Sequence, residues 1–168
     1  MIIILMGVTG SGKSTVGEAL TRALGWSLYE GDDFHPPANI AKMASGSPLD
    51  DEDRWPWLQV LANEIDQWLA RGESVVLTCS ALKQSYRDIL VGGHKQVHIV
   101  HLRGSRELIG GRLAKRQHHY MPPGLLDSQF ADLEIPREIV EVDIAPAPAD
   151  IAANREKWIA AWTEAVLR

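Results

Sequence analysis

The chain has 168 residues, of which 45% are hydrophobic and 23% charged, and its formal net charge is -5. This length and composition predict a single globular domain over residues 1–168 and exclude a disordered or fibrous protein. The negative charge removes the usual electrostatic attraction to nucleic acids and anionic membranes, so we expect a small-molecule partner, with no nucleic acid and no membrane.

Strands and helices are predicted to alternate along the chain. Residues Ile2–Met6 form a short, β-branched apolar run, typical of a strand buried on both faces, and from Ser14 the apolar period becomes helical until Gly25. Further strands are predicted at 26–33, 74–81, 96–104 and 139–144, and further helices around 58–72, 83–90 and 151–166. This order predicts a three-layer α/β fold with a central, mostly parallel five-stranded sheet.

The opening residues "MIIILMG" also bear on location. They lack a basic segment and are much shorter than the apolar core of a signal peptide or a membrane span, so we expect a buried strand there. The single cysteine, Cys79, cannot form an internal disulfide, which suits a reducing compartment. We therefore expect a cytoplasmic protein, with Cys79 in the core or lining the site rather than acting as a nucleophile.

A phosphate-binding loop is predicted between the first strand and the first helix. Its pattern is G-x-x-x-x-G-K-[ST], formed by Gly7, Val8, Thr9, Gly10, Ser11, Gly12, Lys13 and Ser14. Glycines allow the backbone N–H groups to converge on a phosphate, and the helix adds its positive N-terminal end. Lys13 is expected on the β- and γ-phosphates, Ser14 on Mg²⁺, and Thr15 near the α-phosphate.

The remaining motifs indicate which class of P-loop protein this is. The chain has no Asn-Lys-x-Asp motif, which disfavours a GTPase switch, and the strand at 74–81 carries Thr78-Cys79-Ser80 where motor ATPases usually place an acidic residue. Asp32 and Asp33 follow the second strand, so they are expected on the same side of the sheet as the P-loop. A carboxylate there can orient an acceptor hydroxyl, take its proton, and hold Mg²⁺ through water.

Three further segments carry a family resemblance. They are "GDDFHP..N..KM..G.PLDDEDR.PWL", "CSALK..YRD.L" and "SQF..LE.P". Together with the P-loop they resemble gluconokinases of the small P-loop type, which are related in fold to shikimate and nucleoside monophosphate kinases. The similarity extends from Met6 to about Asp143.

The resemblance implies ATP-dependent phosphorylation of D-gluconate at its 6-hydroxyl, giving 6-phospho-D-gluconate and ADP, with Mg²⁺. It implies that Asp32 faces the acceptor hydroxyl and that the sugar-acid side is formed by His35, Lys42, Arg54, Lys83 and Arg87. It also implies a homodimer and a mobile lid over about residues 112–127. In that lid, Arg112 and Arg116 are expected to bind the ATP phosphates, with Arg116 taking part in catalysis.

The chemistry of these residues agrees with the resemblance but leaves alternatives open. Arg54, Lys83 and Arg87 can bind the gluconate carboxylate, yet each could instead pair with a nearby Asp or Glu at the surface. Arg112 and Arg116 are four residues apart, so they share a helix face and could reach one polyphosphate together. Shikimate or another sugar acid remains an alternative acceptor, and a nucleotide-binding regulatory module without catalysis is the alternative outside the enzyme class.

Overall fold

The computed structural model describes residues 1–115, 123–136 and 139–145. Its elements in chain order are β1 (Ile2–Met6), α1 (Lys13–Leu24), β2 (Ser27–Glu30), the 3-10 helix η1 (Gly31–Phe34), α2 (Pro37–Ala44), α3 (Asp51–Ala70), β3 (Val75–Thr78), α4 (Gln84–Val91), β4 (Val97–Arg103), α5 (Arg106–Ala114), α6 (Pro123–Asp132) and β5 (Val140–Asp143). The predicted helix around 151–166 lies outside the described residues.

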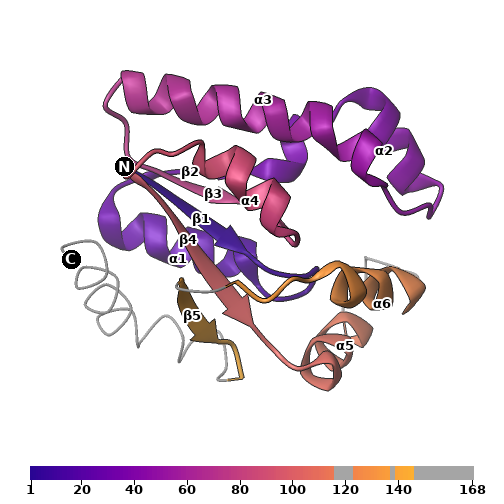
Figure 1. Cartoon of the computed structure of the whole chain (residues 1–168). Coiled ribbons are helices and arrows are strands. Elements are labelled where there is room, and N and C mark those ends of the chain that lie inside the picture. Colours follow the sequence, from indigo (N-terminus) through magenta and orange to yellow (C-terminus); the bar gives the residue numbers. More distant parts are fainter. Residues whose placement is uncertain (116–122, 137–138, 146–168) are drawn as a thin grey trace.

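The five strands form one parallel sheet in the order β2-β3-β1-β4-β5. The central strand β1 is buried along its whole length, and Ile4 pairs with Leu77 on one side and with Ile99 on the other. Helices α3 and α4 cover one face of the sheet and α1 covers the other (Figure 1). The predicted three-layer α/β fold is confirmed, and the sheet is parallel throughout.

Two apolar cores lie on the two faces of the sheet, because successive side chains of a strand point to opposite faces. Ile2 and Ile4 pack with the buried stripe of α3, which includes Leu61, whereas Ile3 and Leu5 join the core on the α1 side. This buried stripe, which runs from Trp57 to Trp68, lies largely within the helix predicted around 58–72. Among the described residues, no helix is long and apolar enough to cross a membrane.

The boundaries differ from the prediction in places that matter for the site. The predicted second strand ends at Glu30, because the chain turns into η1 at Gly31. A Cβ atom at Gly31 would lie 2.4 Å from the backbone oxygen of Thr78, so Gly31 lies directly against the backbone of that strand. Helix α2 was not predicted. The proposed lid is described only in part, as residues 116–122 lie outside the described ranges, and the single domain over 1–168 stays a prediction.

Candidate active site

The P-loop connects β1 to α1 at the carboxyl end of the central strand. Gly12, immediately before α1, has a φ of 92°, and a Cβ atom there would meet nothing within 4 Å, so the backbone conformation rather than crowding favours glycine. At Gly10 a Cβ atom would approach the Leu113 side chain of α5 to 2.8 Å. The loop is therefore shaped by its own backbone and packed closely against α5.

Lys13 begins α1 and folds its side chain back over the loop. Its Nζ donates to the backbone oxygens of Gly7 at 2.9 Å and Val8 at 3.0 Å. Ser14 and Thr15, in the first turn of the helix, are exposed. The ammonium and both hydroxyls are thus at the end of the helix where its dipole favours an anion.

Helix η1 brings Asp32 to the same edge of the sheet. The Trp57 Nε1 donates to the Gly31 oxygen at 2.8 Å, which fixes the start of η1 against α3. The Asp32 side chain is 86% exposed, and it lines a cavity of about 410 Å³ together with Thr9 and Lys13 of the P-loop. This volume lies within the range of roughly 300–1,000 Å³ that is usual for small-molecule sites.

His35 forms a second part of the cavity wall. Its ring stacks on Trp57 at 4.1 Å between centroids, and the Asn39 Nδ2 lies 3.3 Å from its Nδ1 and donates to the Asp53 backbone oxygen at 2.8 Å. An amide donor at Nδ1 assigns the ring proton to Nε2, which lies 3.9 Å from the Asp32 carboxylate. Burial holds the pKa of His35 below its ordinary value of 6.5, against the opposing effect of Asp32.

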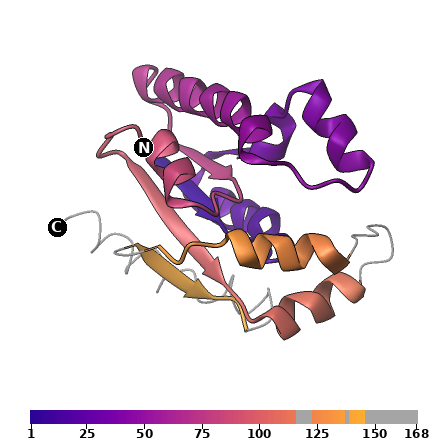
Figure 2. The ribbon, with the colours of Figure 1, turned by 45° about the vertical axis from the view of Figure 1, so that its right-hand side comes forward.

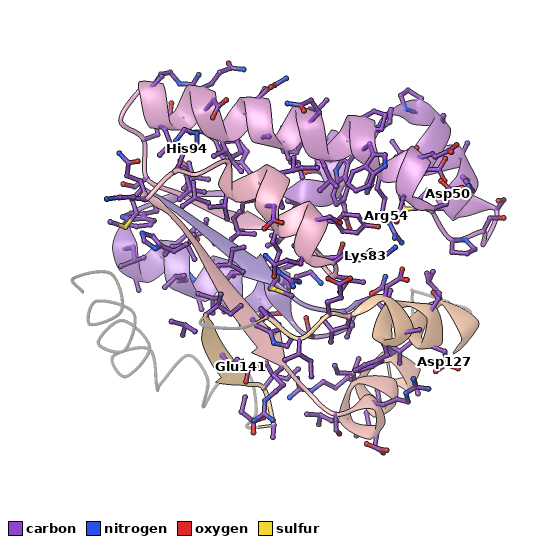
Figure 3. The ribbon with its side chains drawn as sticks, viewed as in Figure 1. Asp50, Arg54, Lys83, His94, Asp127 and Glu141 are labelled. Carbon is purple, nitrogen blue, oxygen red and sulfur yellow. The ribbon has the colours of Figure 1, made fainter. Side chains whose placement is uncertain are left out.

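Arg54 lies on the same wall and is held by a polar network. Its Nη1 donates to the Tyr86 hydroxyl at 3.0 Å and to Asp132 of α6 at 3.2 Å. The Tyr86 hydroxyl donates in turn to Asp51, which also accepts from the Lys83 Nζ at 2.7 Å. Figure 3 shows Arg54 and Lys83 on the side of the α3–α4 layer that faces α6. The network joins α3, α4 and α6 around one guanidinium that borders the cavity.

Two other basic residues predicted at the substrate site have different surroundings. Lys42 bonds to Asp50 at 3.0 Å and to Asp53, and it does not border the cavity. Arg87 is only 2% exposed, and its Nη1 donates to the oxygens of Ala81 at 2.9 Å and Leu82 at 2.8 Å. Arg87 therefore braces the loop after β3, which carries the cavity residue Ser80.

That brace compensates for local strain. Ala81 has a φ of 43°, a region that residues other than glycine rarely adopt. Arg87 also donates from Nε and Nη2 to the Gln84 side chain, at 3.3 and 2.9 Å. Several charge-assisted hydrogen bonds from a planar guanidinium hold the loop more firmly than a single ammonium could. The structure thus places Arg87 behind the cavity wall.

Of the two arginines expected to bind the ATP phosphates, only Arg112 lies within the described residues. In this structure its Nη2 donates to the Ile144 backbone oxygen at 2.6 Å, and the side chain does not border the cavity. Arg116 lies outside the described residues. The binding of ATP phosphates by Arg112 and Arg116 therefore stays a prediction.

Cys79 agrees with the expectation of a core residue. It is buried, and burial raises the pKa of its thiol to about 12. Only the thiolate is a good nucleophile, so a buried thiol with this pKa is a poor nucleophile at neutral pH.

Sequence reasoning assigned no role to several residues that form the site: Asn39, Tyr86, Leu125, Gln129 and Asp132. Asn39, Tyr86 and Gln129 stand in the three segments that carry the family resemblance. Their positions in those segments are the signal that could have found them. Their roles depend on contacts between helices far apart in the chain, as in the bond from the Thr9 N–H to the Gln129 Oε1 at 2.6 Å.

A phosphate-binding loop, an acidic residue beside it and an arginine in the wall of the same cavity define a P-loop kinase that acts on a small molecule. A family model described as an AAA domain matches residues 2–136. A probable gluconokinase of Rattus norvegicus is 44% identical over 173 residues, covering 90% of this chain and 94% of the relative. The gluconokinase of Gluconobacter oxydans is 46% identical over 134 residues, covering 80% of this chain and 75% of the relative.

A solved structure of a gluconokinase is similar to this chain as well. The crystal structure of a gluconokinase from Sinorhizobium meliloti 1021 superposes with a TM-score of 0.86 at 44% identity, covering 96% of this chain and 93% of that one. The chain belongs to the gluconokinase family, which confirms the resemblance found in its sequence.

Proposed function

We propose that this enzyme transfers the γ-phosphoryl group of ATP to the 6-hydroxyl of D-gluconate, giving 6-phospho-D-gluconate and ADP. One observation carries the proposal: Lys13 and Asp32 border the same cavity as Arg54 and His35. The first pair serves phosphoryl transfer, and Arg54 offers a planar fork for a carboxylate. The names of the relatives and of the similar solved structure support gluconate as the acceptor.

The P-loop and Lys13 bind the phosphates of ATP in this proposal. Lys13 exchanges its carbonyl contacts with Gly7 and Val8 for β- and γ-phosphate oxygens. As the acceptor oxygen forms a bond to the γ-phosphorus, the bond from that phosphorus to the β–γ bridging oxygen breaks, and ADP leaves. Asp32 orients the attacking hydroxyl and takes its proton.

The residues at the P-loop also fit a magnesium ion. The exposed Ser14 hydroxyl and the exposed Asp32 carboxylate are hard oxygen donors, the kind that Mg²⁺ prefers. Ser14 would hold the ion directly and Asp32 through water. When bound, the ion supplies positive charge to the phosphates.

The acceptor carboxylate is assigned to Arg54, because Tyr86 and Asp132 hold its guanidinium at the cavity wall. Lys83 and Lys42 are both paired with carboxylates and do not border the cavity, so both contribute positive charge at longer range. His35, neutral because of its lowered pKa, can donate from Nε2 to a hydroxyl. Arg87 acts through the loop that it braces.

Three wider expectations belong to the same proposal. Residues 112–127 are proposed to close over ATP, with Arg112 and Arg116 reaching the phosphates. A homodimer is proposed on the family resemblance, and sedimentation velocity tests it. A cytoplasmic location is proposed because the free thiol of Cys79 suits a reducing compartment.

The test is ADP release with Mg·ATP and a panel of acceptors: D-gluconate, other aldonic acids, shikimate and nucleoside monophosphates. Turnover on D-gluconate that is lost in Lys13→Met but kept in Lys95→Met, a change at an exposed lysine, supports the proposal. Turnover on another acceptor alone would remove gluconate as the substrate. ATP binding with no turnover on any acceptor would favour a regulatory module.

A further inference from the structure

Helix α6 forms a wall of the cavity that the proposed mechanism does not use. Leu125 and Gln129 border the cavity, and Asp132 bonds to Arg54. These three residues recur at spacings of four and three, so they lie on one face of the helix. In Figures 1 and 2, α6 lies opposite α2 and the beginning of α3. One face of one helix therefore reaches both the P-loop and the arginine assigned to the acceptor.

Gln129 holds the P-loop end of this face. Its Oε1 accepts from the Thr9 backbone N–H at 2.6 Å. A backbone N–H can bond only to the oxygen of the amide, so this contact fixes which way the amide group points. The Gln129 Nε2, with two N–H donors, is left on a side chain that borders the cavity, and within the described ranges it has no protein partner.

The contacts of α6 indicate which end of the cavity receives each end of the acceptor. Gln129 lies against Thr9, at the end where the γ-phosphate must be transferred. Asp132, one turn further along, lies at Arg54, where the carboxylate is assigned. A linear acid bound between these ends presents its phosphorylated end to Gln129 and its carboxylate end to Arg54.

We propose that Gln129 is a specificity-determining residue that donates from Nε2 to the 5-hydroxyl of the acceptor, next to the carbon that is phosphorylated. The inference rests on the proposed gluconate kinase activity. The P-loop contact positions the amide, so a hydroxyl at that point is recognised by a donor that needs no reorganisation. An acid that lacks this hydroxyl leaves the amide donor unpaired in the site.

A purely structural role for Gln129 makes a different prediction. If the side chain only fixes α6 to the P-loop, its loss weakens turnover of every acceptor by the same factor. If Nε2 recognises the 5-hydroxyl, its loss matters only for acceptors that carry this group. The two roles therefore differ in whether the loss of activity in the variant depends on the 5-hydroxyl of the acceptor.

The experiment compares kcat/KM for D-gluconate, 5-deoxy-D-gluconate and 2-deoxy-D-gluconate. In Gln129→Met, which keeps the length of the side chain, we expect a loss of roughly tenfold or more on gluconate and 2-deoxygluconate. On 5-deoxygluconate we expect a loss below about threefold, because the hydrogen bond is already absent. Gln67→Met, an exposed change on α3, is the matched control and should leave all three values unchanged.

A second variant guards against a folding defect. Gln129→Glu keeps an oxygen for the Thr9 N–H and lacks the amide donor, so it should show the same dependence on the 5-hydroxyl. Equal losses on all three acids, or coupling to the 2-hydroxyl instead, would overturn the proposal. So would unchanged kinetics in both variants. If the wild-type enzyme does not phosphorylate gluconate, the proposed function fails instead, and that result is visible before any variant is made.

Discussion

The proposed phosphate side and the proposed acceptor side of the cavity are built in different ways. The phosphate side comes from one continuous stretch, Gly7–Ser14, and consists largely of backbone groups. The acceptor side gathers side chains from η1, α3 and α6, such as Asp32, Arg54 and Gln129. A site made of local backbone tolerates few sequences, whereas a site made by packing distant helices can exchange its side chains. The difference explains how one fold can keep ATP and change its acceptor.

The largest effect is expected at the point where the two sides meet. Asp32→Asn removes the group proposed to take the acceptor proton, so kcat should fall by roughly 10²–10⁴-fold. The KM for ATP should change little, because the P-loop is intact. The measurement is steady-state ADP release.

The adjacent carboxylate provides the control for that change. Asp33 is exposed and does not border the cavity, so Asp33→Asn should keep nearly full activity. Equal losses in the two variants would mean that the charge of the segment matters and the position of Asp32 does not.

A change confined to the acceptor side comes next. Arg54→Lys keeps the charge but loses the planar fork, so the KM for gluconate should rise by roughly tenfold to a hundredfold. The KM for ATP should stay within about twofold, since the hydrogen bonds of Arg54 go to Tyr86 and Asp132. Initial rates over a grid of both substrates measure this. A parallel rise in both KM values would break the division between the two sides.

The close approach of η1 to β3, beside the acceptor side, is expected to matter for stability. In Gly31→Ala the new methyl group would overlap the Thr78 backbone oxygen, and the free energy of unfolding should fall by about 1–3 kcal/mol. Urea unfolding measures the loss. Gly111→Ala is the control, because nothing lies within 4 Å of its added methyl group and alanine favours the helix. If Gly31→Ala is no less stable than Gly111→Ala, the close approach is unimportant.

The smallest effect concerns pH. Because the pKa of His35 is below 6.5 in the folded protein, the unfolded chain takes up the proton first as the pH falls. This contribution to stability is complete above about pH 6.5 and is lost as the pH falls through the lowered pKa.

Urea unfolding between pH 7.5 and 5 should therefore show a weaker pH dependence in His35→Gln. Burial also lowers the pKa of His98, so part of the dependence should remain in His35→Gln and become smaller in the double variant. If the free energy of unfolding depends on pH in His35→Gln as it does in the wild type, His35 is not buried in its neutral form.

The same contrast decides how much could be predicted from the sequence. The sheet, α1 and the P-loop follow from local patterns, since the apolar run of β1 and the glycines specify their own conformations. The buried stripe of α3 was also predictable, because its apolar period is long. Asp32 could be placed because every parallel strand ends at the same edge of the sheet.

The acceptor side could not be assembled in this way. Lys42 and Arg87 are both basic residues in matching segments, yet one is paired with carboxylates and the other is buried against carbonyl groups. Only the packing of α3, α4 and the loop after β3 separates these outcomes. Gln129 stands more than a hundred residues from Thr9 in the chain, and no local pattern indicates that they meet.

The state of Cys79 has a practical consequence for studying the enzyme. It is the single cysteine of the chain, and its thiol is buried and protonated at neutral pH. Maleimide reagents react with exposed thiolates, so they should not modify Cys79. A cysteine introduced at an exposed position of α2, such as Ile40→Cys, would then take up a fluorophore selectively without removal of the native residue. The wild-type chain is in this sense already prepared for site-directed labelling beside its own active site.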